Sequence, residues 1–397
     1  MTVPQLDAGT MGVGHSGSPD PRQAARECVQ AALAGRTPQP GDLLVVFTTV
    51  GEDVPAFFDE AAAAAGAATV VGCSAYGCYT TEAPGVGGCS AAYLPAGDLT
   101  FGVGTAESLG SDIAAATEAA VVQARADAGG SGEHDALLLM SDGLAGDQRE
   151  VLRGAYRAAG AQVAIVGGAA ADSLTQTGTY QYARGRTLTN GVVALWINSR
   201  RPVGIGVAHG WRPVGDLMVV TRASGNVVHE LDGRPALEAY LEMRADAEAE
   251  FGAQDAPARS LAERLMDGPL GLPTTAGGYD VRHIFGEGPD GGLVMFGYVS
   301  DNAVVQVMTT SHDELLAAAQ EATAVATRAI GRVSRGALVF SCTARLANLG
   351  EKVVEEGPAI ARGLDGAPAC GLFTYGEFGR STGSSGFHNA TVTVLAV

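Results

Sequence analysis

Residues 43–47, Leu43-Leu44-Val45-Val46-Phe47, form a short apolar run that is followed by two threonines and then by a helical pattern. A run this short, with apolar residues at successive positions, is typical of a strand buried on both faces of a parallel sheet. The helical pattern reaches Ala65, and a second β-rich run, Thr69–Gly72, completes a strand-helix-strand unit. Because such units form right-handed crossovers between parallel strands, the stretch places the protein in the α/β class.

The same unit occurs twice more along the chain, which predicts a fold built from a repeated segment. The first strand and the glycine that ends the second are separated by 25, 27 and 31 residues in the three copies, enough for one crossover helix each time. A further β-rich run closes each copy. The copies comprise 43–47, 57–65, 69–72 and 89–93; then 137–140, 149–159, 163–167 and 192–196; and finally 337–340, 353–361, 369–371 and 391–395.

Antiparallel strands are predicted between the copies. Residues 216–221 and 227–230 flank one turn sequence, and residues 293–299 and 303–308 flank another. A capping box of Ser311 and Glu314 predicts a helix that continues to about residue 330. We therefore expect two domains of mixed, largely parallel sheets with antiparallel hairpin additions.

The expected divisions are a flexible segment over residues 1–19, an α/β domain over 20–233 and a second α/β domain over 234–397. Residues 1–19 are rich in Gly, Ser and Pro, and Asp20 with Pro21 provides the signals of a helix start. The helical pattern that follows residue 234 suits the beginning of the second domain. A length of 397 residues also exceeds that of one typical domain.

Composition and charge exclude several classes of protein. The net charge is −18 and no cluster of Lys or Arg occurs, which argues against nucleic acid as a partner. The N-terminus lacks the pattern of a signal peptide, and no run of 18 apolar residues suggests membrane insertion. The six cysteines form no CxxC pair, so neither a zinc site nor a disulfide framework is predicted. These features favour a cytoplasmic protein.

Candidate site residues follow the first strand of the third copy. Ligands of open α/β sheets gather beyond the carboxyl ends of parallel strands, where Cys342 and Arg345 occur. Cys342 could act as a nucleophile or soft ligand, and Arg345 could bind a carboxylate in bidentate fashion. The alternatives are a small buried thiol and a structural ion pair.

A second group of candidates lies near the C-terminus, where Tyr375 and Glu377 precede a turn and His388 and Asn389 follow it. Glu377 could hold a ligand amine, while Asn389 could donate and accept hydrogen bonds. The alternative for these residues is the chemistry of tight turns. His209, beside Trp211, is either a cofactor ligand or a hydrogen-bonded structural imidazole. No nucleotide-binding or hydrolase fingerprint occurs in the chain.

The motifs in these segments resemble those of the FIST family, from about residue 25 to the C-terminus. The stretches 166–172, 207–215, 220–228 and 230–233 are similar to its N-terminal domain, and 340–345, 375–379 and 387–391 to its C-terminal domain. FIST domains are regarded as sensory modules of bacterial signalling proteins that bind small ligands such as amino acids. Some members bind haem and sense nitric oxide, and many are fused to output regions. Since this chain stops at Val397, we expect it to signal through a separate protein.

Three functions follow as hypotheses. The first is a cytoplasmic sensor that binds an amino acid or a similar small polar metabolite through Cys342, Arg345, Tyr375, Glu377, His388 and Asn389. The second is a haem-binding gas sensor with His209 as an axial ligand and His388 as the other. The third is an enzyme in which Cys342 is the nucleophile and His388 or Glu377 its base.

Overall fold

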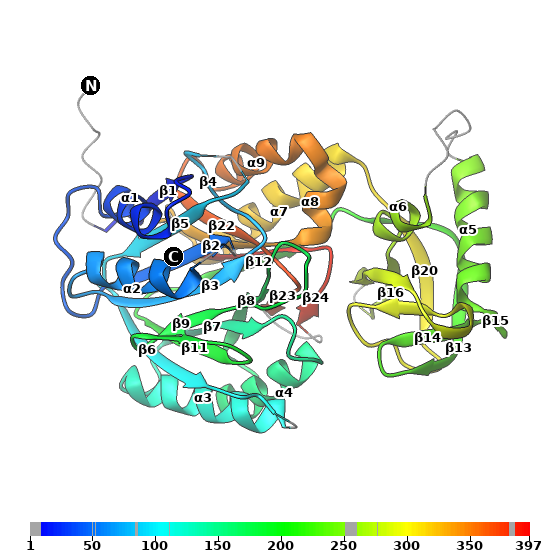
Figure 1. Cartoon of the computed structure of the whole chain (residues 1–397), viewed down its shortest axis with the longest axis horizontal. Helices are drawn as coiled ribbons and strands as arrows, with labels where there is room; N and C mark the ends of the chain where they lie inside the picture. The colour runs from blue at the N-terminus through cyan, green and yellow to red at the C-terminus, as the bar shows by residue number, and fades with distance from the viewer. Residues whose placement is uncertain are drawn as a thin grey trace.

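Three sheets surround one shared core, and a fourth sheet builds a separate lobe (Figure 1). This arrangement is that of a computed structural model, which describes residues 9–49, 51, 53–83, 86–110, 112–250, 260–275, 277–380 and 386–397. The sheets mix parallel and antiparallel strands, which confirms the predicted α/β class. No helix among the described residues has the length and hydropathy needed to span a membrane.

Each of the three predicted copies forms its own sheet. Within a copy, two parallel strands are joined by a helix, and the strand that closes the copy lies antiparallel beside the first of them. A strand and a helix precede this unit in every copy, and that strand pairs with the closing strand. The repeat predicted from the sequence is therefore confirmed, and it is longer than the sequence pattern indicated.

The bounds of the elements follow this scheme. The first copy comprises β1 (Gly12–Ser16), α1 (Pro21–Leu33), β2 (Leu43–Thr49), α2 (Val54–Ala64), β3 (Thr69–Ala75), β4 (Cys78–Thr80) and β5 (Cys89–Leu94). The second comprises β6 (Leu99–Ala106), α3 (Ile113–Asp127), β7 (His134–Asp142), α4 (Gln148–Ala159), β8 (Ala164–Ala170), β9 (Gln181–Ala183), β10 (Arg186–Leu188) and β11 (Val192–Ser199). The third comprises β12 (Gly204–Ala208), α7 (His312–Ile330), β21 (Ala337–Cys342), α8 (Thr343–Leu349), η3 (Gly350–Glu355), α9 (Glu356–Gly363), β22 (Ala369–Thr374), β23 (Glu377–Arg380), β24 (Phe387–His388) and β25 (Val392–Ala396).

The copies exchange one short strand each, in a cyclic manner. Strand β9 of the second copy pairs with β3 of the first, and β23 of the third copy pairs with β8 of the second. Strand β4 of the first copy completes the ring by pairing with β22 of the third. Each copy thus supplies hydrogen bonds to a neighbour, so that the body folds as one unit of three interlocked parts.

The apolar strands of the body bury both of their faces, as their composition predicts. In β2, Val45 and Phe47 point into the core shared by the three sheets, while Leu44 and Val46 pack under α1 and α2. The rings of Phe47 and Phe340 meet in this core at a centroid distance of 6.2 Å. Helices α3 and α4 cover the second sheet, and α7, α8 and α9 cover the third (Figure 1).

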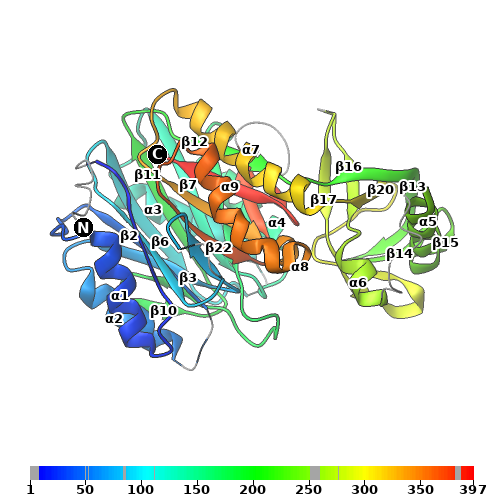
Figure 2. The ribbon, with the colours of Figure 1, turned by 90° about the horizontal axis from the view of Figure 1, so that it is seen from above.

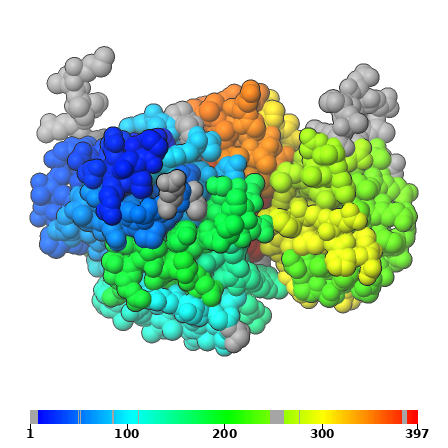
Figure 3. All heavy atoms as spheres, viewed as in Figure 1, coloured from blue at the N-terminus to red at the C-terminus, as the bar shows by residue number. Residues whose placement is uncertain are grey.

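The lobe is an antiparallel β domain inserted between β12 and α7 of the third copy. Figure 2 shows it joined to one end of the body, with α6 close to α8. Its elements are β13 (Arg212–Ser224), β14 (Val227–Leu231), β15 (Arg234–Pro235), α5 (Ala236–Glu250), α6 (Leu261–Met266), β16 (Leu270–Pro273), β17 (Tyr279–Arg282), β18 (Ile284–Glu287), η2 (Pro289–Gly291), β19 (Leu293–Met295) and β20 (Val304–Thr309). The residues of the lobe form one contiguous surface beside the C-terminal part of the chain (Figure 3).

Three sequence-based expectations differ from the structure. Strand β1 lies inside the expected flexible segment and is buried against β5, while residues 1–8 lie outside the described residues. The strands expected to pair around residues 300–302 do not form a hairpin, because β20 pairs with β13 and β16 whereas β19 pairs with β14 and β18. The boundary expected near residue 233 falls inside the β lobe, so the two sequence halves interpenetrate in space.

Candidate functional site

Arg345 belongs to α8, the helix that directly follows β21. Its side chain is fully buried and hydrogen-bonded. Its guanidinium forms an ion pair with Glu356 at 3.2 Å and donates to the hydroxyl of Ser341 at 3.1 Å. It also donates to the backbone carbonyls of Leu315 and His209. Because these partners take most of its donors, Arg345 has few donors left for its predicted role as a carboxylate clamp.

Glu377, at the start of β23, is also fully buried. Its carboxyl group accepts hydrogen bonds from the Thr374 hydroxyl at 2.8 Å and from the backbone N–H of Thr391 at 3.4 Å. Burial raises the pKa of Glu377 well above its usual value, and these hydrogen bonds only partly oppose the effect. Burial thus favours the neutral form of the side chain, and that form offers no charge to a ligand amine.

Cys342 ends β21 next to Glu377 and is almost fully buried. Burial raises the pKa of its thiol, and the neighbouring Glu377 adds to the rise. The thiol is therefore protonated, whereas a nucleophilic cysteine must be a thiolate. This environment removes the basis for the hypothesis of an enzyme with Cys342 as nucleophile.

We expect Cys342 in the folded protein to remain unmodified by iodoacetamide at pH 7.5 over a time in which a free thiol reacts completely. The physical reason is the combination of burial and the raised pKa. Peptide mass spectrometry after alkylation measures the modification, and the same treatment of unfolded protein is the control. Rapid carboxamidomethylation of Cys342 in the folded chain would restore the nucleophile hypothesis.

The two candidate histidines are held by backbone groups. Nδ1 of His209 accepts a hydrogen bond from the backbone N–H of Trp211 at 2.9 Å, and Nε2 of His388 donates to the carbonyl of Gly379 at 2.9 Å. Burial, followed by the charges of His388 and Arg345, lowers the pKa of His209 to about 4. Because Nδ1 accepts from Trp211, the proton of the neutral His209 ring is on Nε2. Iron binding at Nε2 would move this proton to Nδ1 and break the hydrogen bond from Trp211. These residues do not fit the haem hypothesis.

Tyr375 joins the body to the β lobe. Its hydroxyl donates to the carboxylate of Asp172, which also accepts from the backbone N–H groups of Gln176 and Thr177. Burial alone would raise the pKa of Asp172, but these hydrogen bonds outweigh it and lower the pKa to about 2. The Tyr375 ring lies 6.3 Å from that of Phe296, a residue of the lobe. Tyr375 thus orders the loop after β8 and lies at the junction between the body and the lobe.

Asn389, between β24 and β25, has an unusual environment at this junction. Its side chain is 1 % exposed, yet neither its amide oxygen nor its amide nitrogen has a hydrogen-bond partner among the described residues. The nitrogen lies beside Gly376 and the oxygen beside Gly297 of the lobe. Buried amides are nearly always hydrogen-bonded, so a pair of unsatisfied atoms in one side chain indicates a place for a ligand.

Arg282, the last residue of β17, lies on the lobe side of the same junction. Its side chain is 5 % exposed, and its Nη1 donates to the carbonyl of Val281, while its Nε has no partner in the part of the chain that the structure describes. A Cβ atom at Gly297 would lie 3.3 Å from Oδ1 of Asn389 and 3.5 Å from Nε of Arg282. The structure therefore brings together two buried polar side chains that each have atoms without a partner among the described residues, and the sequence analysis singled out only one of them.

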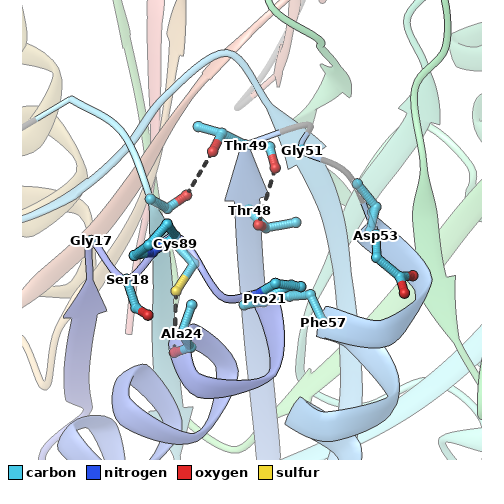
Figure 4. Close-up of a pocket in the computed structure, with 13 residues that line it drawn as sticks. Gly17, Ser18, Pro21, Ala24, Thr48, Thr49, Gly51, Asp53, Phe57 and Cys89 are labelled. Atoms are coloured by element: carbon cyan, nitrogen blue, oxygen red, sulfur yellow. Dashed lines mark hydrogen bonds between the residues drawn. The ribbon is translucent and has the colours of Figure 1, made fainter.

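A separate pocket of about 250 Å³ lies at the end of β2. Two of its hydroxyl groups already have acceptors (Figure 4): Thr49 donates to the carbonyl of Gly88 and Thr48 to that of Thr49. The thiol of Cys89 donates to the carbonyl of Ala24. Thr48 and Thr49 end β2 of the first copy, as Ser341 and Cys342 end β21 of the third. Because Thr48, Thr49 and Cys89 already have partners, this pocket is a weaker candidate than the junction.

The fold and the site together define an α/β protein with a three-sheet body, an inserted β lobe and a buried polar cluster between them. The chain belongs to the FIST family: residues 42–234 match the FIST N domain and residues 236–380 match the FIST C domain. This family assignment confirms the resemblance seen in the motifs.

Similar proteins carry little further functional information. An uncharacterized protein of Mycobacterium bovis is 27 % identical over 237 residues, and one of Mycobacterium tuberculosis is 28 % identical over 239 residues. Each match covers 58 % of this chain, and the chain spans about 60 % of the length of these relatives. A crystal structure of cyanuric acid hydrolase from A. caulinodans covers 98 % of both chains with 12 % identity and a TM-score of 0.36. A likeness this weak carries no argument about function.

Proposed function

We propose that this protein is a cytoplasmic sensor that binds an amino acid or a similar small polar metabolite at the junction between the body and the β lobe, and that it signals through a separate protein. The observation that carries the proposal is the buried side chain of Asn389, whose amide oxygen and nitrogen both lack partners. Leaving a buried polar group unpaired costs about 1–3 kcal/mol, which a ligand that donates and accepts would offset.

The position of this site also supports a sensory role. Asn389 belongs to the body, whereas Gly297 and Arg282, which lie beside it, belong to the lobe. The lobe is connected to the body through residues 209–211 and 310–311, between β12 and β13 and between β20 and α7. A ligand that contacts both parts would favour one arrangement of the lobe, and this differential binding is what a sensor requires.

The proposal is tested by isothermal titration calorimetry with the twenty L-amino acids, on the wild-type protein and on two matched variants. We expect Asn389→Ala to weaken the binding of the tightest ligand by at least about tenfold, because two hydrogen bonds are lost. Asn198→Ala is the control, since that amide lies on β11 and donates to the carbonyl of Gly130. Equal affinity of the wild type and Asn389→Ala would contradict the proposed site.

A further inference from the structure

Arg282 is a buried cation for which the described residues supply no counter-ion. No carboxylate in the described part of the chain lies within ion-pair distance of its guanidinium, and its one hydrogen bond to a described residue goes to the carbonyl of Val281. Buried arginines are normally paired with a carboxylate, because an unpaired buried charge is strongly unfavourable. The other buried arginines of the described chain follow this rule: Arg345 pairs with Glu356, and Arg244 pairs with Asp267 at 2.8 Å.

The carboxylates around Arg282 favour its charge only through space. The charged groups with the largest influence on it are Asp280, Arg149 and Asp147. Asp147 is held by Arg149, whose guanidinium lies over the ring of Tyr298 at 4.0 Å from the centroid. Asp280 favours the cation but Arg149 opposes it, and burial remains the largest influence, so that the pKa of Arg282 is lowered. No carboxylate of the described residues forms an ion pair with this guanidinium, so it is a candidate to bind an anionic group of a ligand.

We propose that Arg282 binds the carboxylate of the ligand, with the Asn389 amide completing the site. A guanidinium pairs with a carboxylate through two parallel hydrogen bonds. The Asn389 oxygen lies on the side of Arg282 and can accept from the adjacent ammonium group, while its nitrogen, on the side of Gly376, can donate to another polar atom of the ligand. Both residues lie beside Gly297, where any side chain would contact them. This assignment rests on the proposed function, gives the ligand class as small α-amino carboxylates, and replaces Arg345 by Arg282 as the carboxylate-binding residue.

A first experiment compares acids with their amides. The probes are the twenty L-amino acids, their primary amides, and the carboxylates acetate, pyruvate and succinate, each titrated into the wild type and Arg282→Gln. We expect the wild type to prefer an amino acid over its amide by at least about tenfold, and Arg282→Gln to lose at least about tenfold in affinity for the acid while binding the amide unchanged. An unchanged affinity of Arg282→Gln for the acid would overturn the inference and leave the proposed function intact.

The other outcomes separate the two proposals. Binding of simple carboxylates that depends on Arg282, without binding of any amino acid, would support the inference and reject the amino-acid part of the proposed function. No binding of any probe to the wild type at 10 mM, roughly the weakest affinity that matters for such metabolites, would reject both.

A second readout needs no ligand. Because Arg282 lacks a counter-ion and Arg244 has one, Arg282→Gln is expected to raise the thermal midpoint of the ligand-free protein, whereas the matched variant Arg244→Gln is expected to lower it. A fall in the midpoint of Arg282→Gln equal to that of Arg244→Gln would show that Arg282 is a structural residue and would overturn the inference. Binding by Arg244→Gln is expected to equal that of the wild type.

Discussion

Arg345→Ala is expected to lower the free energy of unfolding by roughly 3–5 kcal/mol. The variant leaves Glu356 buried without its cation, and it removes the donors that satisfy Ser341 and two backbone carbonyls. Urea unfolding at pH 7, followed by far-UV circular dichroism, measures the loss.

Two further variants test the reason for this effect. Arg345→Met combined with Glu356→Gln is expected to cost much less than the single alanine variant, because no charge is then left unpaired in the interior. Arg153→Ala is the exposed control, since its pair with Glu150 lies at the surface, and it is expected to cost less than about 1 kcal/mol. A loss below about 1 kcal/mol for Arg345→Ala would contradict the stabilising role given to its buried ion pair.

Glu377→Gln is expected to change how the stability depends on pH. Because the folded-state pKa of Glu377 is raised above its usual value of 4.5, the folded wild type retains a proton that the unfolded chain loses. The wild type is therefore expected to lose stability relative to Glu377→Gln as the pH rises above 4.5, by at most about 1.4 kcal/mol per pH unit, until the folded-state pKa is passed.

This prediction concerns only the pH-dependent part of the difference, since the glutamine amide also changes the hydrogen bond from Thr391. Urea unfolding of both proteins at intervals between pH 4 and pH 8 measures it. Glu351→Gln, at an exposed position, is expected to run parallel to the wild type. A difference between the wild type and Glu377→Gln that is constant across this range would show that Glu377 titrates normally in the folded protein.

Much of the body could be predicted from local patterns. Apolar runs such as Leu43–Phe47 indicate strands buried on both faces, and the regular spacing of strands and glycines indicates the repeat, because both depend on residues close together in the chain. The exchange of β4, β9 and β23 could not be predicted in this way. Each is a strand of three or four residues, and its choice of partner depends on the packing of whole copies against each other.

The candidate site was predicted in part. The sequence indicated Glu377, His388 and Asn389 as neighbours, and strand pairing places Glu377 opposite His388. For Arg345 the sequence left two alternatives, a carboxylate-binding residue and a structural ion pair. It could not decide between them, because the ion-pair partner Glu356 lies on another helix. Arg282 was missed, since it belongs to a short strand without a distinctive motif and becomes notable only when its burial and its lack of a counter-ion are seen together.

The most direct test of the ligand site is a crystal structure of the protein with the amino acid that binds most tightly. We expect ligand density at the junction, with the carboxylate within hydrogen-bonding distance of the Arg282 guanidinium and the ammonium group beside the amide oxygen of Asn389. Density in the pocket at the end of β2, together with an empty junction, would contradict this expectation.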